Sequence, residues 1–167
     1  MGISQPAFRN SDWPLHKALA VSGNSMTVLQ MIDIKSQDFT LFVTAVEFAP
    51  DNFLSVRTEI TVSYKSGWLD GDFSLKSIWF GWDAIKDFKR GVESMIAGDY
   101  SSVDLRDMSD DFIFTLSKIE SGVGIHIEGG QRSRSFGFVL KVEEETDLFN
   151  EIHRKIADFI REARANS

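Results

Sequence analysis

The chain has 167 residues, a hydrophobic content of 43%, a charged content of 26% and a formal net charge of -7. This length fits one domain over residues 1–167 with a buried core, and the composition excludes an intrinsically disordered chain. The acidic balance disfavours nonspecific binding to nucleic acid, which relies on neutralisation of phosphates by Lys and Arg.

The sequence contains no cysteine, which excludes disulfides, thiolate metal sites and cysteine nucleophiles. No apolar run approaches the roughly 20 residues that a membrane-spanning helix needs. The N-terminus carries Gln5, Pro6 and Arg9 instead of a basic region followed by an apolar core, so we expect no secretory signal. These features predict a cytoplasmic protein that does not bind membranes.

The first half of the chain is dominated by strand patterns. Residues 1–25 are expected to be weakly structured, apart from a short candidate strand at Ala18–Val21, and a second candidate strand covers Met26–Ile34. The stronger strand that follows has one face made of Phe39, Leu41, Val43 and Ala45. Its opposite face is partly apolar and is expected to carry Phe42, Val46 and Phe48. A strand with both faces apolar is expected to be covered on both sides.

The next strand has one apolar face, made of Leu54, Val56, Ile60, Val62 and Tyr64. Polar residues alternate with this set, which is typical of a strand with one solvated face. The run from Trp68 to Trp79 follows a turn at Ser66-Gly67. Because Asp70-Gly71-Asp72 interrupts that run, we expect a bulge or a bend there.

Two segments change to a helical period. The first, Gly81 to Gly98, has an apolar stripe of Ile85, Phe88, Val92, Met95 and Ile96. Gly98 is suited to end this helix, whereas Gly91 lies inside it, where a close approach to the sheet would explain a glycine. The second helix is expected after 143–147, with Thr146 as its N-cap. Its apolar stripe is Leu148, Ile152, Ile156, Phe159 and Ile160.

Between these helices, the stretch from Asp111 to Val142 predicts three consecutive antiparallel strands. Apolar residues alternate with others along each run, and glycine-containing breaks at 121–122 and 129–131 are typical of hairpins. A short strand with Val103 and Leu105 leads into them. Strands followed by a helix, twice, predict an α+β fold: an antiparallel meander packed against two helices, with the option of curling into a half-barrel.

An acidic cluster is the first candidate site. It consists of Asp99, Asp104, Asp107, Asp110 and Asp111. The spacing does not match a calcium-binding loop, so we expect a solvated edge with turn-forming aspartates rather than a metal site. A further interpretation is an acidic surface that binds a basic protein.

A second candidate is a pocket beside the aromatic residues of the strand-to-helix junction. Its residues are Trp68, Asp70, Asp72, Trp79 and Trp82. Paired carboxylates beside aromatic rings can bind sugars or act as acid and base, although nothing in the spacing fixes the required separation of the carboxyls. Packing is the simpler role for the tryptophans.

Other motifs favour no catalytic chemistry. The histidines at 16, 126 and 153 form no metal-ligand pair, and His126 is expected on the outer face of its strand. Gly122-Val123-Gly124 opens a strand rather than a helix, so it lacks the context of a dinucleotide-binding motif. We therefore expect no cofactor, no metal and no enzymatic activity.

The segment from about Tyr64 to Ile160 resembles the WapI-like bacterial immunity proteins and related small proteins of unknown function. The resemblance covers a little over half of the chain. It rests on the order of the elements and on residues 66–68, Gly71, Phe73, the first helical stripe, Gly98, 112–116, 122–127 and the 136–142 strand before a final helix.

The resemblance implies a non-enzymatic protein that binds and neutralises a cognate toxin, and such toxins are often nucleases. An acidic inhibitor suits a basic toxin, because complementary charge speeds encounter. The alternative hypothesis is a small-ligand-binding or enzymatic domain at the Trp68–Trp82 region. A third is an accessory subunit whose exposed sheet edge pairs with another chain.

Overall fold

The computed structural model describes residues 28–49, 55–67, 69–131, 134–143 and 147–165. Within these residues, the chain forms two four-stranded antiparallel sheets and two helices. The first sheet has the order β1 (Leu29–Lys35), β2 (Phe39–Phe48), β3 (Ser55–Ser66) and β4 (Leu69–Gly81). The second has the order β5 (Ser102–Arg106), β6 (Phe112–Ile119), β7 (Gly122–Gln131) and β8 (Arg134–Glu143). Helix α1 (Trp82–Ala97) joins the sheets, and α2 (Leu148–Ala165) follows the second.

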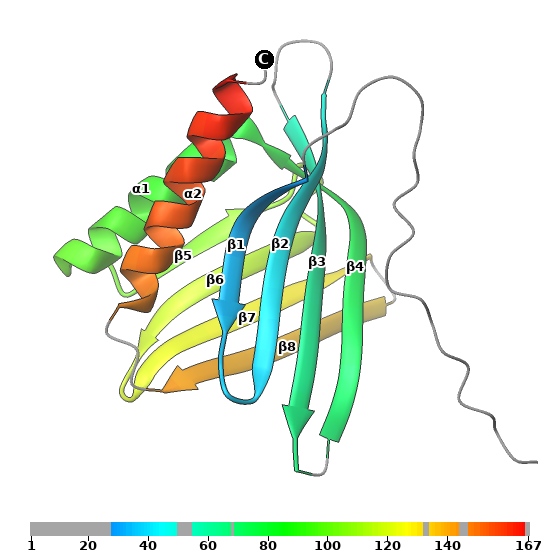
Figure 1. Ribbon diagram of the computed structural model, residues 1–167, viewed down its shortest axis with the longest axis vertical. Coiled ribbons are helices and arrows are strands. Elements are labelled where there is room, and N and C mark those ends of the chain that lie inside the picture. Colours follow the sequence, from blue (N-terminus) through cyan, green and yellow to red (C-terminus); the bar gives the residue numbers. More distant parts are fainter. Residues whose placement is uncertain (1–27, 50–54, 68, 132–133, 144–146, 166–167) are drawn as a thin grey trace, which may run out of the picture.

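The two sheets face each other with their strands crossing, and the helices lie side by side along one flank (Figure 1). This confirms the predicted α+β fold, the antiparallel meander and both helices. The meander does not form one half-barrel: it divides at α1 into two open sheets, each with two edge strands. Several predicted features lie outside the described residues: the candidate strand at Ala18–Val21, the side chains of Leu54 and Trp68, and the proposed N-cap Thr146.

The apolar faces of both sheets and both helices form one continuous core. Phe80 on β4 packs edge-on against Phe112 on β6, with ring centroids 6.0 Å apart. Phe88 on α1 packs against Phe114 on β6 at 5.9 Å, and Phe73 on β4 packs against Phe138 on β8 at 4.3 Å. These rings tie the two sheets and the helix layer together.

Helix α1 packs closely on β5, and Gly91 explains how. Gly91 is buried, and a Cβ added to it would overlap Val103 Cγ2 and lie 3.0 Å from Val103 Cβ. The glycine therefore permits the close approach of helix and strand that its position in the sequence suggested. At the end of α1, Gly98 adopts φ 93°, a left-handed conformation, and its N–H donates to Met95 O, so the predicted helix end is confirmed.

Two irregularities in the first sheet correct the sequence analysis. The register of β2 against β3 shifts between Ala45 and Glu47, so that Phe48 pairs with Val56 on the core face. The Phe48 ring stacks on Phe159 of α2 at 6.1 Å. The assignment of Phe48 to the outer face was wrong, because the extra residue at Val46 reverses the alternation.

The bulge expected at Asp70-Gly71-Asp72 is also absent from that position. These residues pair in regular register with Lys65, Tyr64 and Ser63. The register shift lies further along, between the pairs Thr58–Ile78 and Ile60–Leu75, where Ser77 has φ 63°. Buried Thr58 donates a hydrogen bond from Oγ1 to Ile78 O at this bulge (3.2 Å), which satisfies its hydroxyl inside the core.

We predict that Gly91→Ala destabilises the protein although alanine is the better helix former. The added methyl group overlaps Val103, and overpacking of this kind costs about 1–3 kcal/mol, which exceeds the gain of about 1 kcal/mol in helix propensity. Urea unfolding of Gly91→Ala, Val103→Ala and the double variant checks this. The double variant should recover most of the loss, and simple additivity of the two single changes would contradict the close contact.

Candidate functional site

A groove at the end of the helix pair is the candidate functional site. It lies where the last turn of α1 and the first turn of α2 meet the β6–β7 turn, and it has a volume of about 690 Å³. We call it the helix-end groove. Its residues are Met95, Ile96, Lys118, Ile119, Glu120, Ser121, Gly122, Val123, Phe149 and Asn150.

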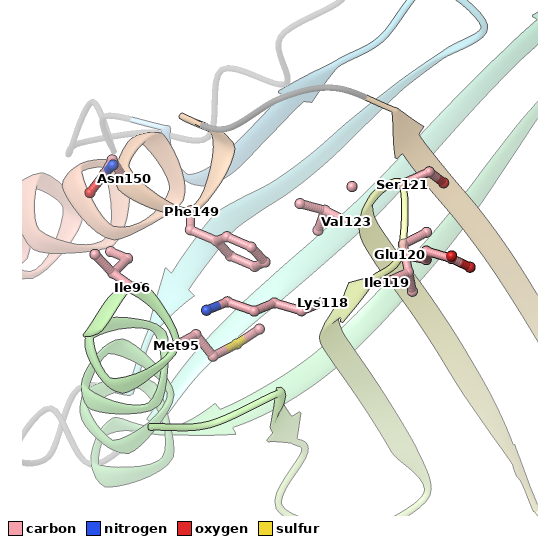
Figure 2. Close-up of a pocket in the computed structure, with 10 residues that line it drawn as sticks. Met95, Ile96, Lys118, Ile119, Glu120, Ser121, Val123, Phe149 and Asn150 are labelled. Carbon is pink, nitrogen blue, oxygen red and sulfur yellow. The ribbon is translucent and has the colours of Figure 1, made fainter. Parts of the chain in front are cut away.

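The centre of the groove is apolar. Met95 and Val123 are buried and form its floor, and half-buried Ile119 and Phe149 stand on opposite sides. Figure 2 shows Met95, Ile96 and Phe149 on the helix side and the β6–β7 turn across from them. Ile96 is 41% exposed at the rim, so its assignment to the buried stripe of α1 was wrong.

Charged side chains flank this apolar centre. In Figure 2, the Lys118 side chain extends from β6 toward the helices, between Met95 and Phe149, whereas Glu120 lies on the turn. Within the described residues, neither Lys118 nor Glu120 takes part in an ion pair. Asp147 accepts a hydrogen bond from Asn150 at the start of α2 (3.2 Å). These groups can pair with charges of an incoming partner.

The surface continues beyond the groove along the segment after α1. Asp99 and Tyr100 are exposed there, Tyr100 by 57%. The carbonyl of Ser101 accepts a hydrogen bond from the Lys118 N–H (2.8 Å), which fixes this segment against β6. An exposed tyrosine and an acidic side chain therefore extend the rim of the groove.

The predicted acidic cluster is spread along β5 instead of converging. Asp99 lies before β5, beside the helix-end groove, whereas Asp107, Asp110 and Asp111 lie in the loop after it. A strand of this length spans roughly 15 Å, so the two ends are separate. Within the parts of the chain that the structure describes, no three His, Cys, Asp or Glu side chains are grouped as metal ligands.

The side chains of Asp104 and Asp107 bind neighbouring groups. Asp104 accepts hydrogen bonds from Thr115 Oγ1 (2.7 Å) and Arg106 Nη2 (2.9 Å) on the outer face of the second sheet. Asp107 accepts one from the Phe112 backbone N–H (2.9 Å) and so closes the β5–β6 turn. Asp110 is exposed with φ 57°. This agrees with the expected turn-forming role of the aspartates.

The described residues of the predicted Trp68–Trp82 pocket, which are Asp70, Asp72, Trp79 and Trp82, also lie apart. Asp70 and Asp72 are exposed on the first half of β4, and the strand rise places Trp79 roughly 20 Å further along. The Trp82 ring packs on Phe159 of α2 at 5.9 Å. Trp79 O accepts a hydrogen bond from Met108 N (2.8 Å), so the structure joins Trp79 to the acidic loop rather than to Asp70 and Asp72.

The helix-end groove does not correspond to either of the sites predicted from the sequence. Phe149 is apolar but falls outside the α2 stripe, and Ile119 lies at the end of its strand. These off-stripe apolar residues are the signal in the sequence, but only the tertiary fold brings them together. His126 does lie on the outer sheet face as predicted, with Nε2 4.0 Å from Glu128.

Comparison with known proteins gives no relative for this chain: no family model, no curated protein and no solved structure matches it. Among the described residues, neither helix is long and apolar enough to cross a membrane.

A side-chain hydrogen bond between Glu93 and His153 joins the two helices. Glu93 Oε1 on α1 accepts one hydrogen bond from Lys89 Nζ in the same helix (2.5 Å). The same oxygen forms a second hydrogen bond with His153 Nε2 of α2 (2.7 Å). The bond from Lys89, followed by the contact with His153, holds the pKa of Glu93 below its ordinary value of 4.5. The contact is partly exposed, so its contribution to stability is small.

We predict that Glu93→Gln lowers the free energy of unfolding at neutral pH by about 0.5 kcal/mol or less. A lowered pKa in the folded state gives a contribution that is present above the ordinary carboxylate pKa and is lost as the pH falls through the folded value. Wild type and variant should therefore converge below about pH 4.5. Urea unfolding over a pH series checks this, with Glu59→Gln as a control, and a difference that grows in acid would contradict it.

Proposed function

We propose that this chain is a non-enzymatic protein-binding domain, an immunity-type inhibitor that neutralises a cognate bacterial toxin in the cytoplasm. The observation that carries the proposal is the helix-end groove, which has an open apolar centre and a charged rim. The resemblance to WapI-like immunity proteins supports the same class of function.

The composition of the groove suits a protein partner. Protein interfaces have an apolar, aromatic- and methionine-rich centre surrounded by a polar rim, and a few central residues carry most of the binding energy. Half-buried Phe149 and Ile119 supply such a centre above buried Met95, and exposed Ile96 and Tyr100 lie at its rim. We expect a side chain of the toxin to pack between Phe149 and Ile119.

Charge supports a basic partner. The chain carries a net charge of -7. Glu120 and Lys118 line the groove, and exposed Asp99 and Asp147 lie outside its lining, close in sequence to Ile96 and Phe149. A basic toxin would be attracted to this side of the molecule, because complementary potentials raise the association rate.

The first test is co-purification with the product of a neighbouring gene that encodes a large protein with a C-terminal toxin domain. Stable binding, and loss of toxicity when both are expressed, are the expected results. Failure to bind any such toxin would remove the main support for the proposal.

We predict that Ile96→Asp weakens toxin binding by roughly tenfold, as expected for a charge placed beside the apolar centre of an interface. Ile96 is already exposed, so the substitution should leave the fold intact. Val28→Asp is the matched control, because Val28 is 65% exposed and lies outside the groove. Isothermal titration with the purified toxin domain measures both, and equal affinities would exclude the groove as the contact surface.

We also predict that Asp99→Lys slows association with a basic toxin several-fold, whereas Asp110→Lys has a smaller effect. Asp99 lies beside the groove, and Asp110 lies beyond the opposite end of β5. The length of this strand, roughly 15 Å, exceeds the distance of about 8 Å over which salt screens charges at physiological ionic strength. Stopped-flow association rates at low and physiological salt check this. A larger effect at Asp110 would move the contact surface to the acidic loop.

A further inference from the structure

The edge strands of the two sheets differ in how they are protected. Exposed edges invite pairing with another chain, and proteins block them with bulges, short length, charge or a covering element. In the first sheet, β1 has a register shift between Gln30 and Ile32 and packs on α2, and β4 has the bulge at Ser77. In the second sheet, β5 has five residues and packs on α1.

The fourth edge, β8, carries charged residues at Lys141 and Glu143, but within the described residues it has no bulge, is not short and is not covered by a helix. Its ten residues pair with β7 in one register without a shift, and the strand contains no proline. Within the described residues, β7 is the strand that pairs with it, so its other side has no strand neighbour. Alternate residues of β8 therefore direct their N–H and C=O groups away from the sheet.

A groove of about 680 Å³ runs along this free edge. Five consecutive residues of β8, from Val139 to Glu143, line it. Successive side chains of a strand point to opposite faces, so a groove on one face would be lined by every second residue. Lining by consecutive residues shows that the groove follows the backbone edge itself.

The groove has a second wall on the first sheet. The β1–β2 turn, from Ser36 to Phe39, and Tyr64 on β3 stand across from β8, where Figure 1 places that turn beside the C-terminal part of β8. Two backbone hydrogen bonds, from Ser36 N to Phe39 O (2.8 Å) and from Lys65 N to Asp38 O (2.7 Å), fix the turn. Because both sides are walled, the space suits a single extended segment rather than the edge of another whole sheet.

Charge indicates the chemistry of that segment. Asp38, Lys141 and Glu143 line the groove and are exposed, and none takes part in an ion pair within the described residues. The acidic groups outnumber the lysine, so an occupant with a basic side chain is favoured. Exposed Val139, at 67%, offers an apolar contact on the same strand.

We propose that β8 binds an extended, basic segment of a partner protein by strand addition, so that the segment becomes the fifth strand of the second sheet. The proposal rests on the proposed function only in assigning the segment to a protein partner. Backbone hydrogen bonds to the edge supply affinity, and the β1–β2 turn and Tyr64 select side chains. The segment spans roughly five residues, or about 17 Å.

The probe is a phage-displayed library of random linear peptides selected on the purified chain. Selected peptides should be rich in β-branched residues with at least one Lys or Arg. Amide hydrogen exchange measured by NMR, with and without a selected peptide, then gives the decisive signature. Protection should rise at alternate residues between Val139 and Glu143, because the others already bond to β7.

Charge reversal tests the recognition. Glu143→Lys and Asp38→Lys should each weaken peptide binding about two- to fivefold, the range expected for exposed ion pairs. Glu128→Lys is the matched control, since Glu128 is an exposed acid on the outer face of β7. Both groove variants change exposed side chains, and their circular dichroism should match that of wild type.

Three results would overturn the proposal: selection of no peptides, protection that rises elsewhere than at alternate β8 amides, or a dimer of the chain paired through β8 in sedimentation. The outcome is independent of the proposed function. Peptide addition at β8 without any toxin binding would reject the immunity role alone. Toxin binding that depends on Ile96 but leaves the β8 amides unprotected would reject strand addition alone.

Discussion

The apolar interior between two crossed, open sheets must be sealed, and the rest of the structure depends on how this is done. Each sheet is apolar on one face only, and neither closes on itself. The two amphipathic helices fill the flank next to β1 and β5, where Phe88 and Phe159 enter the core. Burial of this surface drives folding, and the close seat of α1 on β5 requires the absence of a side chain at Gly91. The opposite flank is closed by side chains, with Phe73 against Phe136 and Phe138.

This arrangement also places the two candidate binding surfaces. The helix-end groove forms because the β6–β7 turn meets the ends of both helices, where Phe149 is only partly buried against the core and Ile96 is exposed. The groove along β8 forms because neither of the described helices packs on that side and the β1–β2 turn lies across from the strand. The first surface offers side chains and the second offers backbone groups, so the two are suited to different parts of a partner: a folded face and an extended segment.

Local patterns predicted the elements well but not their partners. Alternation identified β6, β7 and β8, and the helical period identified both helices, because each pattern reflects the burial of one face. The division into two sheets depends on contacts between residues far apart, which alternation does not encode. Alternation also does not reveal single-residue bulges. The bulge at Val46 places Phe48 on the core face, and no glycine marks the bulge at Ser77 in the sequence. The candidate sites follow the same rule. Asp107 was recognisable as a turn residue, whereas the helix-end groove required the tertiary meeting of Ile96, Ile119 and Phe149.

Among the described residues, the order of four strands followed by a helix occurs twice. Helix α1 nevertheless packs on β5 of the second sheet, and α2 packs on β1 of the first. The helix of each half of the chain thus covers the sheet formed by the other half. During synthesis the first sheet leaves the ribosome long before α2 is made, and at about 5–20 residues per second the delay is on the order of several seconds. Until then, the apolar face around Ile32, Val43 and Phe48 has no cover from α2. Among the elements that the structure describes, α2 is therefore the one whose synthesis lets the first sheet bury its apolar face.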